Sequence, residues 1–158
     1  MELGSDVPLF LGPGAARMTG RGERVEATEV WPFVAVLYLP DCPCSTAEVY
    51  AAFDAAGGAA GCPNWSDRPF PPAMLSQPPS AWREGLRNHL AGPATRVRPE
   101  LEGILRRLAR AANLPVCVTG SGSAMFIACD DAAEAGETLA RLPGELARRC
   151  VLVRRNSW

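Results

Sequence analysis

The chain has 158 residues, a formal net charge of -1 and 47% hydrophobic residues. These values are typical of a globular protein with one hydrophobic core, and the chain is too short for two ordinary domains. The charge balance gives no sign of nucleic-acid or membrane-surface binding, and no run approaches the roughly 20 apolar residues of a membrane helix. Because the N-terminus also lacks a signal-peptide pattern, we expect a cytoplasmic protein.

Residues 1–29 contain two short apolar runs, VPLFL and AARM, separated by Gly-Pro-Gly and followed by the turn-forming Gly-Arg-Gly-Glu at residues 20–23. We expect strands and turns here. An apolar strand without neighbours exposes both its backbone and its side chains. We therefore predict that residues 1–29 are the C-terminal remnant of a domain whose other strands are missing, and that residues 30–158 form a second domain.

The apolar run FVAVLYLP at residues 33–40 has the length of a buried strand and ends at a proline. It is followed by Ser45-Thr46-Ala47-Glu48, a capping box that predicts the start of a helix. Apolar residues at helical spacing continue this pattern as far as Phe53. A strand therefore leads into a helix.

Residues 57–79 are rich in glycine and then in proline, which favours an irregular connection. The sequence SAWREGLRNHLA predicts a helix from Ser80 to Ala91, and a second helix is expected to start near Pro99. The second helix has an apolar face and an arginine-rich face. The apolar face comprises Leu101, Ile104, Leu105 and Leu108, and the solvated face comprises Arg106, Arg107 and Arg110.

The last third predicts a strand at residues 115–119, a strand at 123–129, a helix capped by Asp130 or Asp131, and a strand at 150–155. Counted from residue 33, this order is that of the split βαβ or ferredoxin-like fold, an α+β fold in which helices cover one face of a four-stranded antiparallel sheet. The expected core includes Val34, Val36, Leu105, Val118, Phe126 and Val153.

The TGSGS sequence at residues 119–123 connects the two central strands and allows two interpretations. Glycine supplies the positive φ of a tight hairpin turn, so the segment is explained by topology alone. Alternatively, its backbone N–H groups bind an anion, because glycine lets a ligand approach without Cβ clashes. The local sequence leaves both open.

The six cysteines, Cys42, Cys44, Cys62, Cys117, Cys129 and Cys150, are scattered, so no disulfide framework is expected. The Cys42-Pro43-Cys44 pair has no second pair at zinc-finger spacing, and His89 is the only histidine. We therefore predict no metal site built by the protein.

Several motifs appear in the order seen in a known family. They are the GSDVPLF sequence at residues 4–10, GRGE at 20–23, STAEVY at 45–50, Asn88 with Leu90, and GSGS at 120–123. In this order the chain resembles the 4-diphosphocytidyl-2-C-methyl-D-erythritol kinases of the GHMP superfamily, and the resemblance covers nearly all of it. The resemblance implies ATP- and Mg²⁺-dependent phosphorylation of a hydroxyl on a CDP-linked methylerythritol in non-mevalonate isoprenoid biosynthesis, by a two-domain fold.

The resemblance also implies roles for particular residues. Asp6 corresponds to the family's proposed catalytic base, Tyr50 to the aromatic residue that stacks on cytosine, and Thr46 to a substrate contact. Gly120, Ser121, Gly122 and Ser123 would face the transferred phosphate. The residues alone allow simpler roles, in which Asp6 caps a turn and Tyr50 packs against the sheet.

Two parts of the family's machinery, the glycine- and serine-rich ATP-phosphate loop and an early lysine, would lie upstream of residue 1. All 16 basic residues of this chain are arginines, so a phosphate-clamping lysine must come from outside it. We therefore expect a C-terminal fragment of the kinase. The alternative is a non-catalytic ferredoxin-like module that binds a small ligand or a protein, because this fold hosts many functions.

Overall fold

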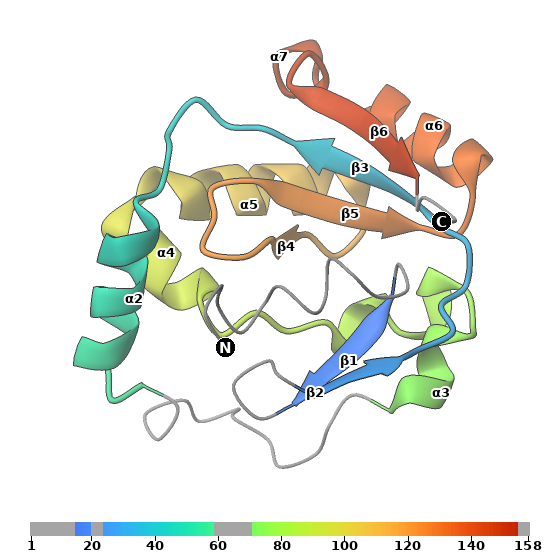
Figure 1. The fold of residues 1–158 in the computed structure, drawn as a ribbon. Helices are drawn as coiled ribbons and strands as arrows, with labels where there is room; N and C mark the ends of the chain where they lie inside the picture. The colour runs from blue at the N-terminus through green and yellow to red at the C-terminus, as the bar shows by residue number, and fades with distance from the viewer. Residues whose placement is uncertain (1–14, 20–23, 59–70, 155–158) are drawn as a thin grey trace.

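The computed structural model describes residues 15–19, 24–58 and 71–154 (Figure 1). The strands are β1 (Ala16–Thr19), β2 (Arg24–Ala27), β3 (Val34–Tyr38), β4 (Cys117–Val118), β5 (Met125–Cys129) and β6 (Cys150–Arg154). The helices are α2 (Thr46–Ala55), α3 (Pro72–Leu75), α4 (Ala91–Val97), α5 (Glu100–Ala112), α6 (Ala132–Arg141) and α7 (Gly144–Ala147). Two 3₁₀ turns, η1 (Pro79–Ala81) and η2 (Arg83–Gly85), precede α4.

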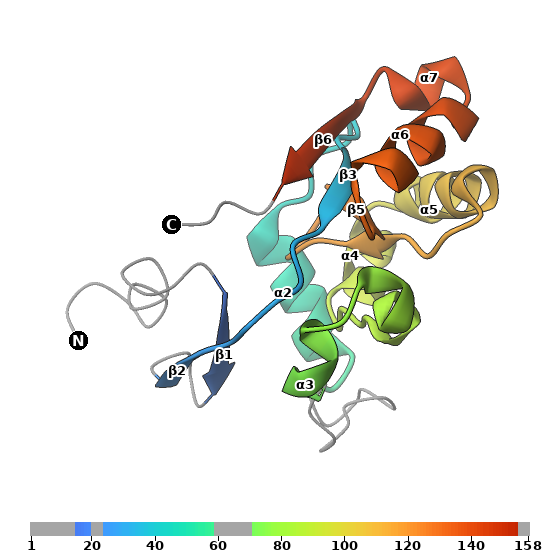
Figure 2. The same ribbon diagram turned by 90° about the vertical axis from the view of Figure 1, so that its right-hand side faces the viewer.

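The main sheet has the strand order β4-β5-β3-β6, and all of its neighbours are antiparallel. β3 lies at its centre, where Val36 is paired with Ile127 of β5 and with Leu152 of β6. Figure 2 shows α5, α6 and α7 together on one side of this sheet. The predicted ferredoxin-like arrangement of the four strands is therefore confirmed.

The core lies between the sheet and the helices. The alternating residues Val34, Val36 and Tyr38 are buried, as expected for the covered face of a strand. Leu101 and Leu108 of α5 are also buried against this cluster. The core predictions for Val34, Val36 and Val118 are confirmed, Leu105 packs against the core partly buried, and Phe126 is half-buried.

The core prediction for Val153 is wrong, because its side chain is 38% exposed. Val153 is paired with Ala35, which lies on the face of β3 opposite to Val34 and Val36. Its strand, β6, is also the edge of the sheet. Val151 and Leu152, which alternate between the two faces of this edge strand, are 45% and 46% exposed, so the edge position accounts for the exposure of Val153.

The helix ends follow the predicted capping residues. Ser45 caps α2 and accepts a hydrogen bond from the backbone N–H of Glu48 at 3.3 Å. Asp131 caps α6 in the same way through Glu134, at 2.9 Å. At the other end of α5, Asn113 adopts a left-handed conformation with φ of 54°, a common way for a helix to end.

The predicted helix over residues 80–91 is wrong, since the structure has η1, η2 and an extended segment there and α4 begins only at Ala91. Tertiary contacts override the helical pattern. The buried Trp82 packs edge-on against Phe33 and donates its indole N–H to the Gln77 carbonyl at 2.9 Å. Arg83 reaches Glu134 of α6 at 2.9 Å, and this anchor fixes the chain in a turn.

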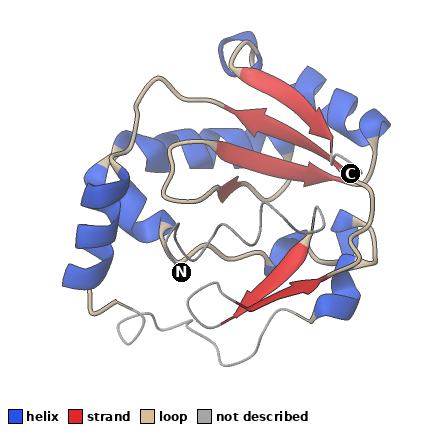
Figure 3. Cartoon of the chain, in the orientation of Figure 1, coloured by secondary structure: helices blue, strands red, loops and turns tan. Residues whose placement is uncertain are grey.

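Strands β1 and β2 form a separate two-stranded antiparallel ladder, distinct from the main sheet in Figure 3. The AARM run was expected as a strand, and β1 covers most of it. The VPLFL run lies outside the described residues. The proposed domain boundary after residue 29 stays a prediction.

The longest helix among the described residues, α5, has 13 residues. No described helix combines the length and the hydropathy needed to cross a membrane.

Candidate functional site

The loop of residues 119–123 joins β4 to β5. These strands pair Val118 with Met125, and the N–H of Thr119 donates to the Ala124 carbonyl at 3.0 Å, so the hairpin interpretation describes the topology correctly. Inside the loop, the N–H of Gly122 donates to the Thr119 carbonyl at 3.0 Å. Within the described part of the chain, the N–H groups of Gly120, Ser121 and Ser123 have no hydrogen-bond partner. The hairpin thus leaves three donors available to a ligand.

Both glycines of the loop have positive φ, 56° for Gly120 and 87° for Gly122. A Cβ on Gly120 would meet nothing within 4 Å. A Cβ on Gly122 would lie 3.4 Å from the Cys44 sulfur and 3.4 Å from a methyl carbon of Val118. At position 122, glycine is favoured both by the positive φ and by the neighbours that a Cβ would contact. At position 120, it is favoured by the positive φ alone.

The first turn of α2 contacts this loop directly. The hydroxyl oxygens of Thr46 and Ser121 lie 2.9 Å apart in a hydrogen bond, although 75 positions separate the two residues. The structure therefore brings together Thr46 and the glycine- and serine-rich loop, two parts of the site that the sequence predicted separately.

Tyr50 is 51% exposed on the surface of α2. It lies four residues after Thr46, and residues at this spacing share one face of a helix. The interpretation in which Tyr50 packs against the sheet is therefore wrong. An exposed phenol ring near Thr46 and the loop is available to a ligand.

Asn88, in the segment before α4, also holds the loop. Its amide nitrogen donates to the carbonyls of Val118 and Gly120, each at 2.8 Å. Its amide oxygen accepts from the backbone N–H of Leu90 at 2.9 Å. The sequence singled out Asn88 only as part of a resemblance, and a contact of this kind becomes visible only in three dimensions.

The cysteine pair lies beside the loop. Cys42 and Cys44 are half-buried and unbonded to each other. Burial, with the nearby Cys42 thiol as a smaller cause, raises the pKa of the Cys44 thiol, so this sulfur stays protonated at neutral pH. Among the described residues, no three histidine, cysteine or acidic side chains gather closely enough to hold a metal ion.

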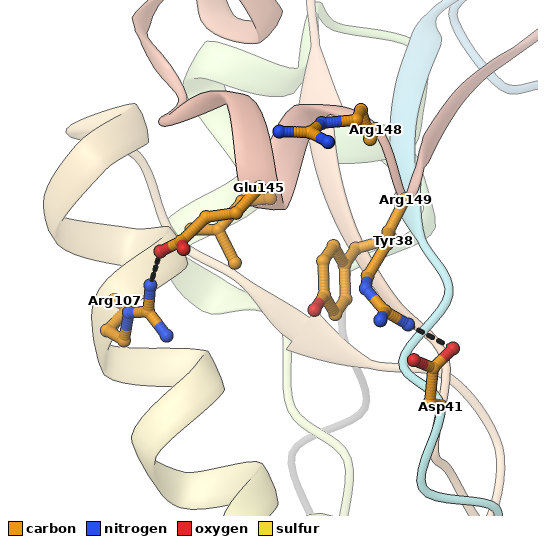
Figure 4. A pocket seen from close by; sticks show the side chains of 7 residues that line it. Tyr38, Asp41, Arg107, Glu145, Arg148 and Arg149 are labelled. Carbon is orange, nitrogen blue, oxygen red and sulfur yellow. Dashed lines mark hydrogen bonds and ion pairs between the residues drawn. The ribbon is translucent and has the colours of Figure 1, made fainter.

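A second concave region, which the sequence did not reveal, lies at the same end of the sheet beneath α7 (Figure 4). It is a cavity of about 530 Å³ lined by Tyr38, Asp41, Arg107, Glu145, Leu146, Arg148 and Arg149. Arg107 pairs with Glu145 and Arg149 with Asp41. The hydrogen bond from Arg149 holds the pKa of Asp41 below its usual range. Since most of its charge is already paired, this cavity is a weaker candidate site than the loop.

The candidate site therefore consists of the loop 119–123, the first turn of α2 and Asn88. Asp6, the predicted catalytic base, lies outside the described residues.

The family profile described as GHMP kinases C terminal matches residues 72–147. The 4-diphosphocytidyl-2-C-methyl-D-erythritol kinase of Hyphomonas neptunium is 39% identical over 132 residues, which are 81% of this chain and 43% of that protein. The protein of the same name from Corynebacterium efficiens is 36% identical over 146 residues, 91% of this chain and 45% of that protein. A crystal structure of 4-(cytidine 5'-diphospho)-2C-methyl-D-erythritol kinase matches with a TM-score of 0.65 and 31% identity, over 96% of this chain and 53% of that one.

Residues 72–147 therefore belong to the C-terminal domain family of the GHMP kinases, and the main sheet and helices of the chain have the fold of that part of the kinase structure. Within that family the relatives of the chain are the 4-diphosphocytidyl-2-C-methyl-D-erythritol kinases, and the chain corresponds to their C-terminal portion. The chain spans about half the length of the curated relatives it matches. The predicted fold class and the resemblance are both confirmed.

Proposed function

We propose that this chain supplies the C-terminal part of an enzyme that phosphorylates a hydroxyl of 4-diphosphocytidyl-2-C-methyl-D-erythritol with ATP. The names and sequence identities of its relatives support the substrate. The observation that carries the proposal is the hydrogen bond between Thr46 and Ser121, because it joins the expected substrate helix to the expected phosphate loop.

The loop suits a phosphate oxygen. Its free N–H groups at Gly120, Ser121 and Ser123 can each donate a hydrogen bond, and donors fixed in place stabilise the charge that develops during phosphoryl transfer. ATP supplies the phosphoryl group and brings Mg²⁺ bound to its phosphates. The described residues offer no cluster of carboxylates for that ion, so we assign none of them as a ligand.

The remaining roles belong to Asp6, Thr46 and Tyr50. As the substrate hydroxyl oxygen forms its bond to the γ-phosphorus and the bond to ADP breaks, the hydroxyl proton passes to the Asp6 carboxylate. Thr46 contacts the substrate, and the exposed Tyr50 ring stacks on its cytosine, an interaction worth roughly 1–3 kcal/mol. Residues 30–158 act as the domain that carries Thr46, Tyr50 and the loop, and residues 1–29 belong to the preceding domain with Asp6.

A chimeric enzyme tests this function. In it, this chain replaces the aligned C-terminal segment of the Hyphomonas neptunium kinase, and phosphate transfer from ATP to the CDP-linked substrate is followed by phosphorus NMR. We expect a phosphorylated product. Replacing Asp6 by Asn should lower kcat by about 10²–10⁴ with little change in melting temperature, because asparagine turns the chain as well as aspartate does. Tyr50→Ala should mainly raise KM.

A folded chimera without transfer activity would contradict the proposal and favour the non-catalytic module. Near-normal kcat in the Asp6→Asn variant would remove Asp6 from the mechanism but leave the kinase assignment in place.

A further inference from the structure

Asn88 uses its whole side-chain amide to connect two backbone segments. The nitrogen donates to the carbonyls of Val118 and Gly120, and the oxygen accepts from the N–H of Leu90. All three distances lie between 2.8 and 2.9 Å, which is the range of well-formed hydrogen bonds. The turn before α4 is thereby tied to the end of β4 and to the loop.

The hydrogen bond from Asn88 to the Gly120 carbonyl also fixes the direction of the next backbone N–H, that of Ser121. The peptide bond from Gly120 to Ser121 is trans, and in a planar trans peptide the C=O and the following N–H point in opposite directions. With the Gly120 carbonyl held by Asn88, the N–H of Ser121 must point away from Asn88. The same geometry is visible two peptides earlier, where Asn88 holds the Val118 carbonyl and the N–H of Thr119 reaches across to Ala124.

The orientation matters because this loop has little else to hold it. Its two glycines have the freest backbones of any residue type. Among the described residues, its backbone N–H groups make two hydrogen bonds, from Thr119 to Ala124 and from Gly122 to Thr119. The Ser121 hydroxyl adds one contact, to Thr46. Loss of the Asn88 donors would leave the 120–121 peptide free to rotate.

We propose that Asn88 is a positioning residue for phosphate binding, which aims the backbone N–H of Ser121 at the bound anion by holding the carbonyl of Gly120. This inference rests on the proposed function, since it takes the loop as the phosphate-binding part of the site. Asn88 itself contacts no phosphate. The role depends on the amide nitrogen, and aspartate, which has the same shape, lacks this donor when ionised.

The test uses the whole chain with inorganic sulfate as the probe, because the charge of sulfate does not change over the pH range needed. Binding is followed through the proton–nitrogen NMR shifts of Gly120, Ser121 and Ser123. The variants are Asn88→Asp and Asn88→Ala, and the matched control is Asn113→Asp at the end of α5, the same chemical change outside the loop. Melting temperatures are recorded for each protein.

At neutral pH we expect sulfate to bind the Asn88→Asp and Asn88→Ala variants at least about 10-fold more weakly than the wild type, with the control unchanged. As pH falls through the carboxyl range near pH 4, the protonated side chain of the Asn88→Asp variant regains one donor. Its affinity should then recover to within about fivefold of wild type measured at the same pH, while Asn88→Ala stays weak. The charged and titratable groups near the loop are common to both proteins and cancel in this ratio; they are Glu48, Arg98, Arg87, His89, Cys42, Cys44 and Cys117.

The outcomes separate the two ideas. Wild-type binding with equal affinity in both Asn88 variants would overturn the positioning role and leave the phosphate loop intact. A spectrum of the Asn88→Asp variant that loses its dispersion throughout would make Asn88 a folding residue and also overturn the proposal. No response of the wild-type loop to sulfate would overturn the phosphate loop itself, and the positioning role with it.

Discussion

The loop of residues 119–123 and the cavity beneath α7 lie at the same end of the sheet, yet different interactions hold them. Around the loop, the contacts are hydrogen bonds between neutral groups, from Asn88 to two carbonyls and from Ser121 to Thr46. Around the cavity, they are ion pairs between exposed side chains, Arg107 with Glu145 and Arg149 with Asp41.

The difference between neutral hydrogen bonds and ion pairs shows how this chain can prepare a site for an anion. Each arginine of an ion pair already has its counter-charge, and an anion that enters must displace a carboxylate. The backbone donors of the loop have no such competitor, and the contacts of Asn88 and Thr46 keep them in place without adding charge. Fixed dipoles of this kind need little reorganisation when charge arrives.

The largest effect we predict is on the loop itself. Gly122→Ala should lower the free energy of unfolding by about 2–3 kcal/mol, because a φ of 87° lies beyond the left-handed region open to L-residues and its Cβ would be in contact with Cys44 and Val118. Gly120→Ala, at a φ of 56° and in open space, should lower it by only about 1 kcal/mol. Urea unfolding of both variants measures the two values. Equal losses would show that the close approach at Gly122 contributes nothing.

The next effect concerns Tyr38, a buried side chain in the wall of the cavity. Burial raises the pKa of its phenol, so the folded state resists ionisation more than the unfolded state does. The neutral phenol therefore makes its full contribution to folding stability below the unfolded pKa of about 10, and this contribution is lost as pH rises above that value. Thermal unfolding of wild type and Tyr38→Phe should therefore show a difference that shifts in favour of the variant only at alkaline pH. A pH-independent difference would contradict the burial of this hydroxyl.

The smallest effects should come from the ion pairs. Glu145→Gln should change the free energy of unfolding by less than about 1 kcal/mol, and added salt should erase the change, since the side chains of Arg107 and Glu145 are 57% and 63% exposed. A loss of several kcal/mol would mean that the ion pairs hold the cavity as firmly as the hydrogen bonds hold the loop, and would contradict the difference between the two regions.

Asp41 provides the pH test of the second pair. Its pKa is lowered in the folded protein by the hydrogen bond from Arg149, so its contribution is present above the ordinary aspartate pKa and lost as pH falls through the lowered value. The stability difference between wild type and Asp41→Asn should shrink on acidification, as unfolding curves at several pH values would reveal. A stability difference that grows at low pH would contradict a lowered pKa for Asp41 in the folded protein.

The sequence predicted the elements whose signals are local. The capping residues Ser45 and Asp131, the apolar face of α5 and the strand β3 each depend on neighbours in the chain, and each was found as expected. The helix predicted over residues 80–91 failed because Trp82 and Arg83 take partners from distant segments. Short-range patterns contain no information about such partners.

In the candidate site too, some parts were predicted from the sequence, and others were revealed only by the fold. The loop was named from its glycine and serine residues, which form a motif by themselves, and Thr46 was named through the family resemblance. The contact between Thr46 and Ser121 and the anchoring by Asn88 join residues 75 and about 30 positions apart, and only the fold brings them together. The arginine cavity was missed for the same reason, since it is assembled from β3, α5, α7 and the segments beside them.

The central claim is that the loop, and not the cavity, faces the reacting phosphate. The most direct test compares two variants in the chimeric kinase by steady-state kinetics. Asn88→Ala should lower kcat by about 10–100-fold, whereas Arg148→Gln, in the wall of the cavity, should leave kcat within about twofold of the parent chimera. A loss of kcat in the Arg148→Gln variant with normal kcat in the Asn88→Ala variant would contradict the account.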